Sequence, residues 1–253
     1  KSPEQMLGEL DAIIAQPGHP AVVYFVDDNF IGNRKATKDM LPHLVAWQKK
    51  NDYPLQFACE ATLNMAKQPD ILELMRQANF MTVFVGIETP EEDALAGIDK
   101  KHNAAVPMYE AIETLNSYGL EVTSGIILGL DTDTDQSEQK LIDFIDKSAV
   151  PVLTMNLLQA LPKTPLWDRL TRENRLVHDA ALESNVLFKR PHDDVVASWR
   201  RAIAHAYTPE HLFERFKHQC DVTYGNRIVT PTKGKLTKTN LRRGLILGFS
   251  PLK

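Results

Sequence analysis

The sequence predicts an α/β protein built on a parallel sheet that is covered by helices. The run at 21–26 is apolar throughout and is followed at once by Asp27, Asp28 and Asn29. A continuous run of this kind is typical of a strand buried on both faces. Strand-like and helix-like segments then alternate five times at roughly 30-residue spacing, which indicates βαβ crossovers. The 253 residues, 43% of them apolar, suffice for one large core.

The elements are justified by their periodicity and by the residues that begin and end them. Ser2 followed by Pro3 has the pattern of a helix start, Pro69 and Pro90 begin later helices, and Gly119 ends one. Strands are expected at 21–27, 55–60, 81–87, 121–128 and 152–158, followed by helices at 35–50, 70–78, 90–97 with 105–118, 134–148 and 164–174.

The alternation stops after Glu173, and the remaining chain has a different pattern. Two helices are expected at 192–206 and 208–219, separated by Thr208 and Pro209, and no clear period follows. The predicted domains are an α/β part at 1–175, a helical extension at 176–225 and a basic tail at 226–253, which contains seven Lys or Arg residues and no acidic ones.

Charge and cysteine content narrow the classes of function. A net charge of -4 argues against a general nucleic-acid binder, so no nucleic-acid partner is expected. Two cysteines, Cys59 and Cys220, are too few for a disulfide framework and favour a reducing, cytoplasmic location. The tail mixes arginines with large apolar residues, so peripheral membrane contact through 226–253 is a hypothesis beside that of a solvated tail.

Polar residues and glycines follow the predicted strands at their carboxyl ends. In parallel sheets these ends meet at one edge, where ligands bind. Each residue alone has an ordinary structural explanation as a turn former, a helix cap or a packing glycine. The candidate site residues are Asp27, Asp28, Asn29, Glu60, Glu88, Gly125, Gly129, Asn156 and Leu161.

Four segments in order resemble the radical S-adenosylmethionine (SAM) superfamily, in particular the subgroup with a cobalamin-binding domain. They are Phe-Val-Asp-Asp-Asn-Phe-Ile-Gly-Asn, Gly-Ile-Glu-Thr-Pro, Gly-Ile-Ile-Leu-Gly-Leu-Asp-Thr and Leu-Pro-Lys-Thr-Pro-Leu-Trp. The resemblance covers about residues 1–175, and 185–224 is similar to a C-terminal extension found in part of that subgroup. It implies a partial (β/α)₆ barrel of the TIM-like kind, here without its first strand.

The resemblance also implies roles for the candidate residues. Asp27 and Asp28 would contact the SAM amino group with help from nearby backbone, and Asn29 is a further cofactor-binding candidate beside them. Glu60 would face the methionine moiety. Glu88 would bind the ribose hydroxyls, and Lys100 would pair with the carboxylate. The adenine pocket would comprise Gly125, Gly129, Asn156 and Leu161. Lys163 stands where relatives often have glycine.

By the same resemblance, SAM is cleaved to a 5′-deoxyadenosyl radical by a [4Fe-4S] cluster, with methyl transfer in cobalamin-dependent members. The cluster loop, Cys-x₃-Cys-x₂-Cys, does not occur in the sequence. Its cysteines are expected upstream of Lys1, and no metal ligand is expected within the chain itself. A fragment that is inactive alone is therefore expected, with a degenerate homologue as the alternative.

The expected partners are a small or lipid-like substrate and a reducing electron donor. Two other functions stay open. One is a different TIM-barrel enzyme in which the carboxylates at the strand ends bind a divalent metal or act as acid and base. The other is a binding module without catalysis, which the missing cluster cysteines would permit.

Overall fold

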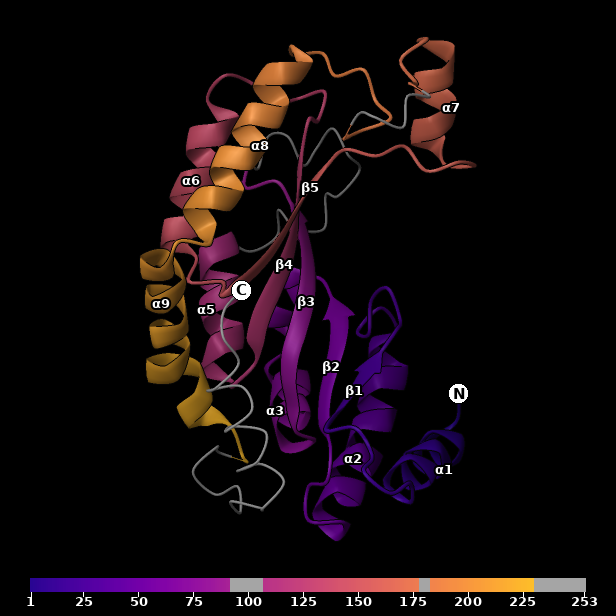
Figure 1. Cartoon of the computed structure of the whole chain (residues 1–253). Coiled ribbons are helices and arrows are strands. Elements are labelled where there is room, and N and C mark those ends of the chain that lie inside the picture. The colour runs from indigo at the N-terminus through magenta and orange to yellow at the C-terminus, as the bar shows by residue number, and fades with distance from the viewer. Residues whose placement is uncertain (92–106, 178–182, 230–253) are drawn as a thin grey trace.

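The structure is a computed structural model that describes residues 1–91, 107–177 and 183–229 (Figure 1). Its centre is a sheet of five parallel strands in the order β1-β2-β3-β4-β5, which is also their order along the chain. The strands are β1 (Val22–Phe25), β2 (Gln56–Ala61), β3 (Phe80–Glu88), β4 (Glu121–Leu128) and β5 (Val152–Leu157). The predicted α/β class and parallel sheet are confirmed.

The helices begin and end close to the predicted positions. Ser2 accepts a hydrogen bond from the Gln5 amide in a capping box, and Gly119 follows α5 with a φ of +80°. The longer helices are α1 (Pro3–Ile14), α2 (Arg34–Lys50), α3 (Pro69–Gln77), α5 (Met108–Ser117), α6 (Ser137–Lys147), α7 (Pro165–Arg172), α8 (His192–Ala206) and α9 (Pro209–His218). Short helical turns follow at η1 (Leu63–Lys67), η4 (Gln219–Thr223) and η5 (Tyr224–Asn226).

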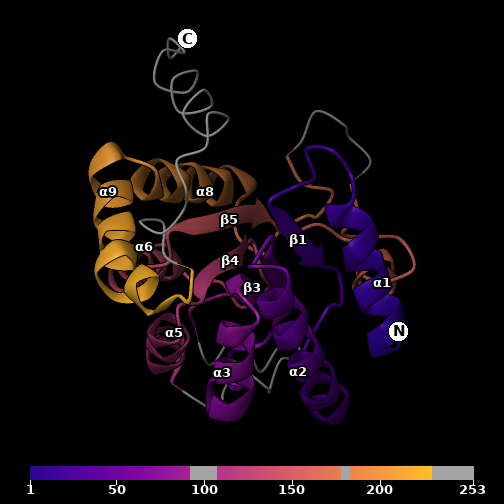
Figure 2. The same cartoon turned by 90° about the horizontal axis from the view of Figure 1, so that it is seen from below.

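The two faces of the sheet have opposite character. One face packs against the helices that surround the sheet in Figure 2, and its side chains, such as Phe57, Val83 and Val85, are fully buried. The other face is open and carries alternate residues of each strand, among them Tyr24 and Thr154, which are exposed. Alternation of this kind places the core on the helical side and leaves the opposite face for a ligand.

The first strand differs from the prediction of burial on both faces. β1 is an edge strand with Phe25 buried, whereas Val22 and Tyr24 are 50% and 44% exposed. A continuous apolar run indicates that at least one face of a strand is buried. It does not show whether another helix or strand covers the second face. That prediction was therefore wrong.

The helical extension packs beside the other edge strand, β5 (Figure 1). The Tyr207 hydroxyl donates to the Leu153 carbonyl at 2.6 Å and accepts from the Leu153 amide at 3.1 Å. The Trp199 indole donates to the Met155 carbonyl at 2.9 Å. These side chains satisfy backbone groups that would otherwise remain open at the edge of the sheet.

Some of the predicted elements and site residues lie outside the described residues. This applies to Lys100, to most of the helix expected at 90–97 and to the tail from residue 230 onward. Within the described part of the chain, no helix has the length and apolar character needed to cross a membrane.

Candidate functional site

A cavity of about 460 Å³ lies on the open face of the sheet, toward the carboxyl ends of β3, β4 and β5. Four predicted site residues meet in it: Glu88, Gly125, Asn156 and Leu161. The wall is completed by Phe84, Ile126, Ile127, Thr154, Leu157, Gln159, Glu183 and Trp199. Among the described residues, the lining combines apolar surface with two carboxylates and no Lys or Arg, which suits a ligand that carries positive charge.

Glu88 is held in a strained backbone conformation at the mouth of this cavity. Its φ is +67°, in the left-handed region that non-glycine residues rarely adopt. The register between β3 and β4 shifts between Gly86 and Glu88, so a bulge at the strand end redirects the carboxylate. Strain of this kind costs about 1–3 kcal/mol and is concentrated at functional sites.

The two predicted glycines lie in different surroundings. A Cβ added at Gly125 would lie 3.1 Å from the ring of Phe84 and 3.5 Å from the Thr154 hydroxyl, on the cavity side. A Cβ at Gly129 would lie 2.5 Å from the ring of Phe188, and Gly129 is not among the cavity lining. Gly125 therefore keeps the cavity floor flat, whereas Gly129 permits close packing of the extension.

The acidic turn after β1 lies next to the end of β2. The Phe30 amide donates to the Glu60 carbonyl at 2.8 Å, and the Tyr24 hydroxyl donates to the Glu60 carboxylate at 3.2 Å. Burial and the charge of Glu60 raise the pKa of Tyr24 to about 12, so its hydroxyl remains a donor. Asp27 and Asp28 are exposed on this turn.

Asn29 supplies a further polar atom to the turn. Its Oδ1 is buried and accepts no hydrogen bond from the described residues. A buried acceptor without a partner is costly, which is what a donor group on a ligand would relieve.

Sequence reasoning missed the residues that other parts of the chain bring to the cavity. Trp199 comes from α8, and Glu183 lies beyond α7, where its carboxylate pairs with Arg200 at 2.7 Å. No local pattern could place them, because their position depends on how the extension docks on β5. Phe84 and Thr154 were detectable from the sequence. Each lies between two buried residues of its strand, so its side chain points to the opposite, open face.

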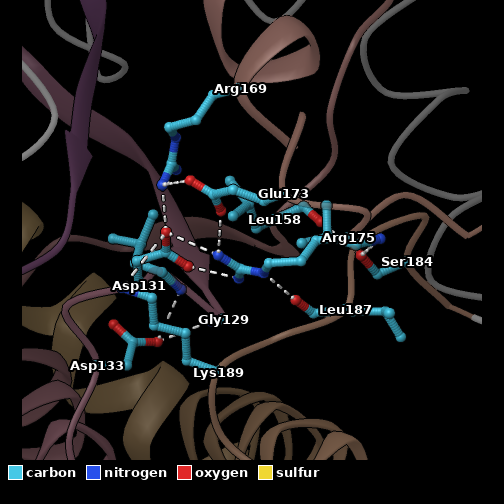
Figure 3. Close-up of polar contacts among 12 residues, drawn as sticks. Gly129, Asp131, Asp133, Leu158, Arg169, Glu173, Arg175, Ser184, Leu187 and Lys189 are labelled. Carbon is cyan, nitrogen blue, oxygen red and sulfur yellow. Dashed lines mark hydrogen bonds and ion pairs between the residues drawn. The ribbon is translucent and has the colours of Figure 1, made fainter. Parts of the chain in front are cut away.

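A second polar cluster fixes the segment after β4 against α7 and the chain beyond it (Figure 3). The Asp131 carboxylate accepts from Arg169 at 2.5 Å and from Arg175 at 2.6 Å. The hydrogen bonds from Arg175 and Arg169 lower the pKa of Asp131 to about 2. Nearby, burial raises the pKa of Asp133 to about 6, although its Oδ2 accepts from the Gly129 amide at 2.7 Å.

The Asp131 cluster borders a second cavity. It has a volume of about 610 Å³ and lies beyond the ends of β4 and β5. Its lining is Leu130, Asp131, Thr132, Leu158, Pro165, Leu166, Arg169 and Lys189.

The turn at Lys163 has a φ of +68°, which explains why glycine would suit that position.

Comparison with known families decides the classification. The model of the radical SAM superfamily matches residues 1–145, and that of a domain of unknown function (DUF4070) matches 164–248. The chain belongs to the radical SAM superfamily. A similar curated protein is the hopanoid C-2 methylase of Rhodopseudomonas palustris (strain TIE-1), which is 58% identical over 98% of this chain and 47% of its own length.

A second curated protein and a solved structure are also similar to this chain. An uncharacterized methyltransferase of Synechocystis (PCC 6803) is 33% identical over 89% of this chain and 43% of its own length. The chain thus spans about half the length of these curated relatives. Among solved structures, TsrM of Kitasatospora setae has a TM-score of 0.58 at 17% identity, covering 68% of this chain and 33% of TsrM. That likeness shows the fold, and a TsrM structure contains cobalamin and a [4Fe-4S] cluster.

The cysteines of this chain do not fit an iron–sulfur cluster. Cys59 is fully buried on the helical side of β2, where burial raises the pKa of its thiol, and Cys220 is exposed in η4. Cluster ligation requires several thiolates around one site. These two thiols lie apart on different elements and cannot hold the cluster.

The expectation of cluster cysteines upstream of Lys1 stays a prediction. Lys1 itself is exposed at the start of the described chain, and its Nζ pairs with the Glu9 carboxylate of α1 at 2.7 Å. An exposed ion pair of this kind stabilises a protein by at most about 1 kcal/mol, and neither Lys1 nor Glu9 lines the cavity on the open face.

Proposed function

We propose that this chain forms the SAM-binding part of a cobalamin-dependent radical SAM methyltransferase that acts on a lipid-like substrate. The proposal rests mainly on the cavity in which Glu88, Gly125, Asn156 and Leu161 meet at the carboxyl ends of the strands. The 58% identity to a hopanoid C-2 methylase supports both methyl transfer and a polycyclic, lipid-like acceptor.

The residues of the cavity have the chemistry that the nucleoside of SAM requires. Glu88 would accept hydrogen bonds from the ribose hydroxyls, with the added strength of an ionised acceptor. Gly125 would let adenine lie flat on the strand, with Asn156 and Leu161 completing the pocket. The Glu88 carboxylate would also favour the sulfonium charge by Coulomb attraction.

The methionine end of SAM would extend toward β1 and β2. The buried Oδ1 of Asn29 lacks a donor among the described residues, and the ammonium group of SAM would supply one. Glu60, Asp27 and Asp28 add acceptors beside it. Lys100, which lies outside the described residues, is the proposed partner of the SAM carboxylate.

The cluster and the cobalamin would need ligands from outside these 253 residues. When bound, the [4Fe-4S] cluster supplies the electron for cleavage of SAM to the 5′-deoxyadenosyl radical, which makes a reducing electron donor a proposed partner. This chain alone would bind SAM weakly and perform no turnover, because the thiolates of a cluster site are missing from its sequence.

The second cavity is the proposed place for the apolar acceptor. Leu130, Leu158, Pro165 and Leu166 give it an apolar wall at the same end of the sheet. We further propose a cytoplasmic location, with the basic tail at 226–253 contacting the membrane from which a lipid-like substrate would be drawn.

The proposal is tested by SAM binding to the purified chain, measured by equilibrium dialysis with labelled SAM. We expect Glu88→Gln to weaken binding about tenfold, because it removes the charge but keeps the size of the side chain. Glu113→Gln, a change on α5 away from the cavity, is the matched control and should leave binding unchanged. Equal affinity in Glu88→Gln and the unaltered chain would refute the assigned ribose contact, and absence of saturable binding would refute the site.

A further inference from the structure

Three elements meet at a cluster of metal-binding side chains away from the proposed SAM site. Asp146 lies in the last turn of α6, His205 near the end of α8, and His211 in the first turn of α9. One ligand atom from each lies within 4.8 Å of the other two. His205 Nε2 is 2.7 Å from Asp146 Oδ1, and the two imidazole centroids are 4.0 Å apart.

No metal ligand was expected within this chain from its sequence. The three residues come from three separate helices, and Asp146 is far in sequence from the two histidines. Their spacing therefore matches no local ligand motif, and only the packing of α8 against α6 and of α9 against α8 brings them together.

The environment of His211 prepares it for metal binding. Its Nδ1 is 2.8 Å from the His205 carbonyl oxygen, which can only accept, so Nδ1 carries the proton. The basic lone pair is then on Nε2. Thr208, the N-cap of α9, lies 3.0 Å from the same Nδ1 and fixes the ring further. Metal-binding histidines are commonly oriented by a backbone carbonyl in this way.

Open space and further oxygen ligands lie beside the three side chains. A cavity of about 440 Å³ is lined by Asp146 and His211 and also by Glu214 and Asp221, which are exposed carboxylates. The buried guanidinium of Arg215 donates to the Ala206 carbonyl and lies in the same cavity wall. Its positive charge repels a bound cation and so disfavours cation binding. Two lysines, Lys147 and Lys217, also line the cavity, so its carboxylates offset its positive side chains.

We propose that Asp146, His205 and His211 bind a divalent transition metal of the zinc class. Two imidazoles and one carboxylate form a ligand set that zinc accepts, with one position left for water. Bonds of about 2.0–2.1 Å place tetrahedral ligand atoms roughly 3.3 Å apart, which small rotations of these partly exposed side chains can reach. The metal would tie α8 and α9 of the helical extension to α6 of the α/β part.

The direct test is titration of the metal-stripped, untagged chain with Co²⁺, which reports tetrahedral coordination through its visible absorption. We expect one Co²⁺ per chain, displaced by Zn²⁺, and a weakening of at least tenfold in Asp146→Asn and His205→Gln. With Zn²⁺ bound, hydrogen exchange in 202–212 and 137–147 should slow in the unaltered chain but not in these variants.

Two controls separate this site from adventitious binding. His43→Gln removes an exposed histidine on α2, and Cys220→Ser removes the exposed thiol, so both should bind Co²⁺ as the unaltered chain does. Co²⁺ binding that is unchanged in both Asp146→Asn and His205→Gln, or that is lost in Cys220→Ser, would overturn the proposal. No saturable binding below about 100 µM Co²⁺ would overturn it too, since a site of three protein ligands should exceed that affinity.

Discussion

Replacing Gly125 by alanine should separate ligand binding from stability at the proposed site. The added Cβ would lie 3.1 Å from the Phe84 ring and 3.5 Å from the Thr154 hydroxyl, so only the far end of one side chain must shift. Alanine in a strand interior gains about 0.5–1 kcal/mol over glycine, which offsets the tight contact. The free energy of unfolding should therefore change by less than about 1 kcal/mol.

The same methyl group should strongly weaken SAM binding. It would occupy the surface on which we place the adenine, and overpacking by one methyl group typically costs about 1–3 kcal/mol. That cost corresponds to roughly 5- to 150-fold in affinity. Urea unfolding and equilibrium dialysis with labelled SAM measure the two effects separately.

A matched glycine provides the control for this prediction. A Cβ at Gly8, in α1, meets nothing within 4 Å, so Gly8→Ala should stabilise the chain without changing SAM affinity. If Gly125→Ala binds SAM as tightly as Gly8→Ala does, the adenine does not lie on β4 and the assignment of this surface is refuted.

Three further changes have defined expected outcomes. Gly129→Ala should lower the free energy of unfolding by about 2–4 kcal/mol in urea titrations, because φ is +88° and Cβ would lie 2.5 Å from Phe188; a loss under about 0.5 kcal/mol would contradict the packing. Burial raises the folded pKa of Asp133 to about 6, so the free energy of unfolding should fall as pH rises from about 4 to 6, when the buried carboxyl ionises. Asp133→Asn should reduce this pH-dependent fall by up to about 3 kcal/mol. If the free energy of unfolding of the variant and of the unaltered chain depended on pH in the same way, the charge of Asp133 would not be buried. Trp199→Phe should cost about 1–3 kcal/mol by leaving the Met155 carbonyl without its donor, with SAM affinity kept; a large loss of affinity would instead make the indole itself a ligand contact.

The periodic part of the fold was predictable from the sequence. β4 was expected at 121–128 and is observed at Glu121–Leu128, because Gly119 ends the preceding helix and the segment is rich in apolar and β-branched residues. The break between α8 and α9 was expected at Thr208 and Pro209, where the threonine caps α9. Such features can be identified in a single sequence, because helix capping and apolar periodicity depend on residues that are close along the chain.

The surroundings of each element were not predictable in the same way. The apolar run of β1 suggested burial on both faces, yet Tyr24 is exposed because it lies on the face of the sheet that no helix covers. Gly125 and Gly129 looked equivalent four residues apart, but only Gly125 faces the cavity. The contribution of Trp199 depends on long-range docking of the extension, which no local pattern reports.

A crystal structure of the chain soaked with SAM would show whether SAM binds on the open face of the sheet. We expect adenine density against Gly125 and ribose density within hydrogen-bond distance of the Glu88 carboxylate. SAM density in the cavity beside Leu130 and Asp131, with the open face left to water, would contradict this expectation.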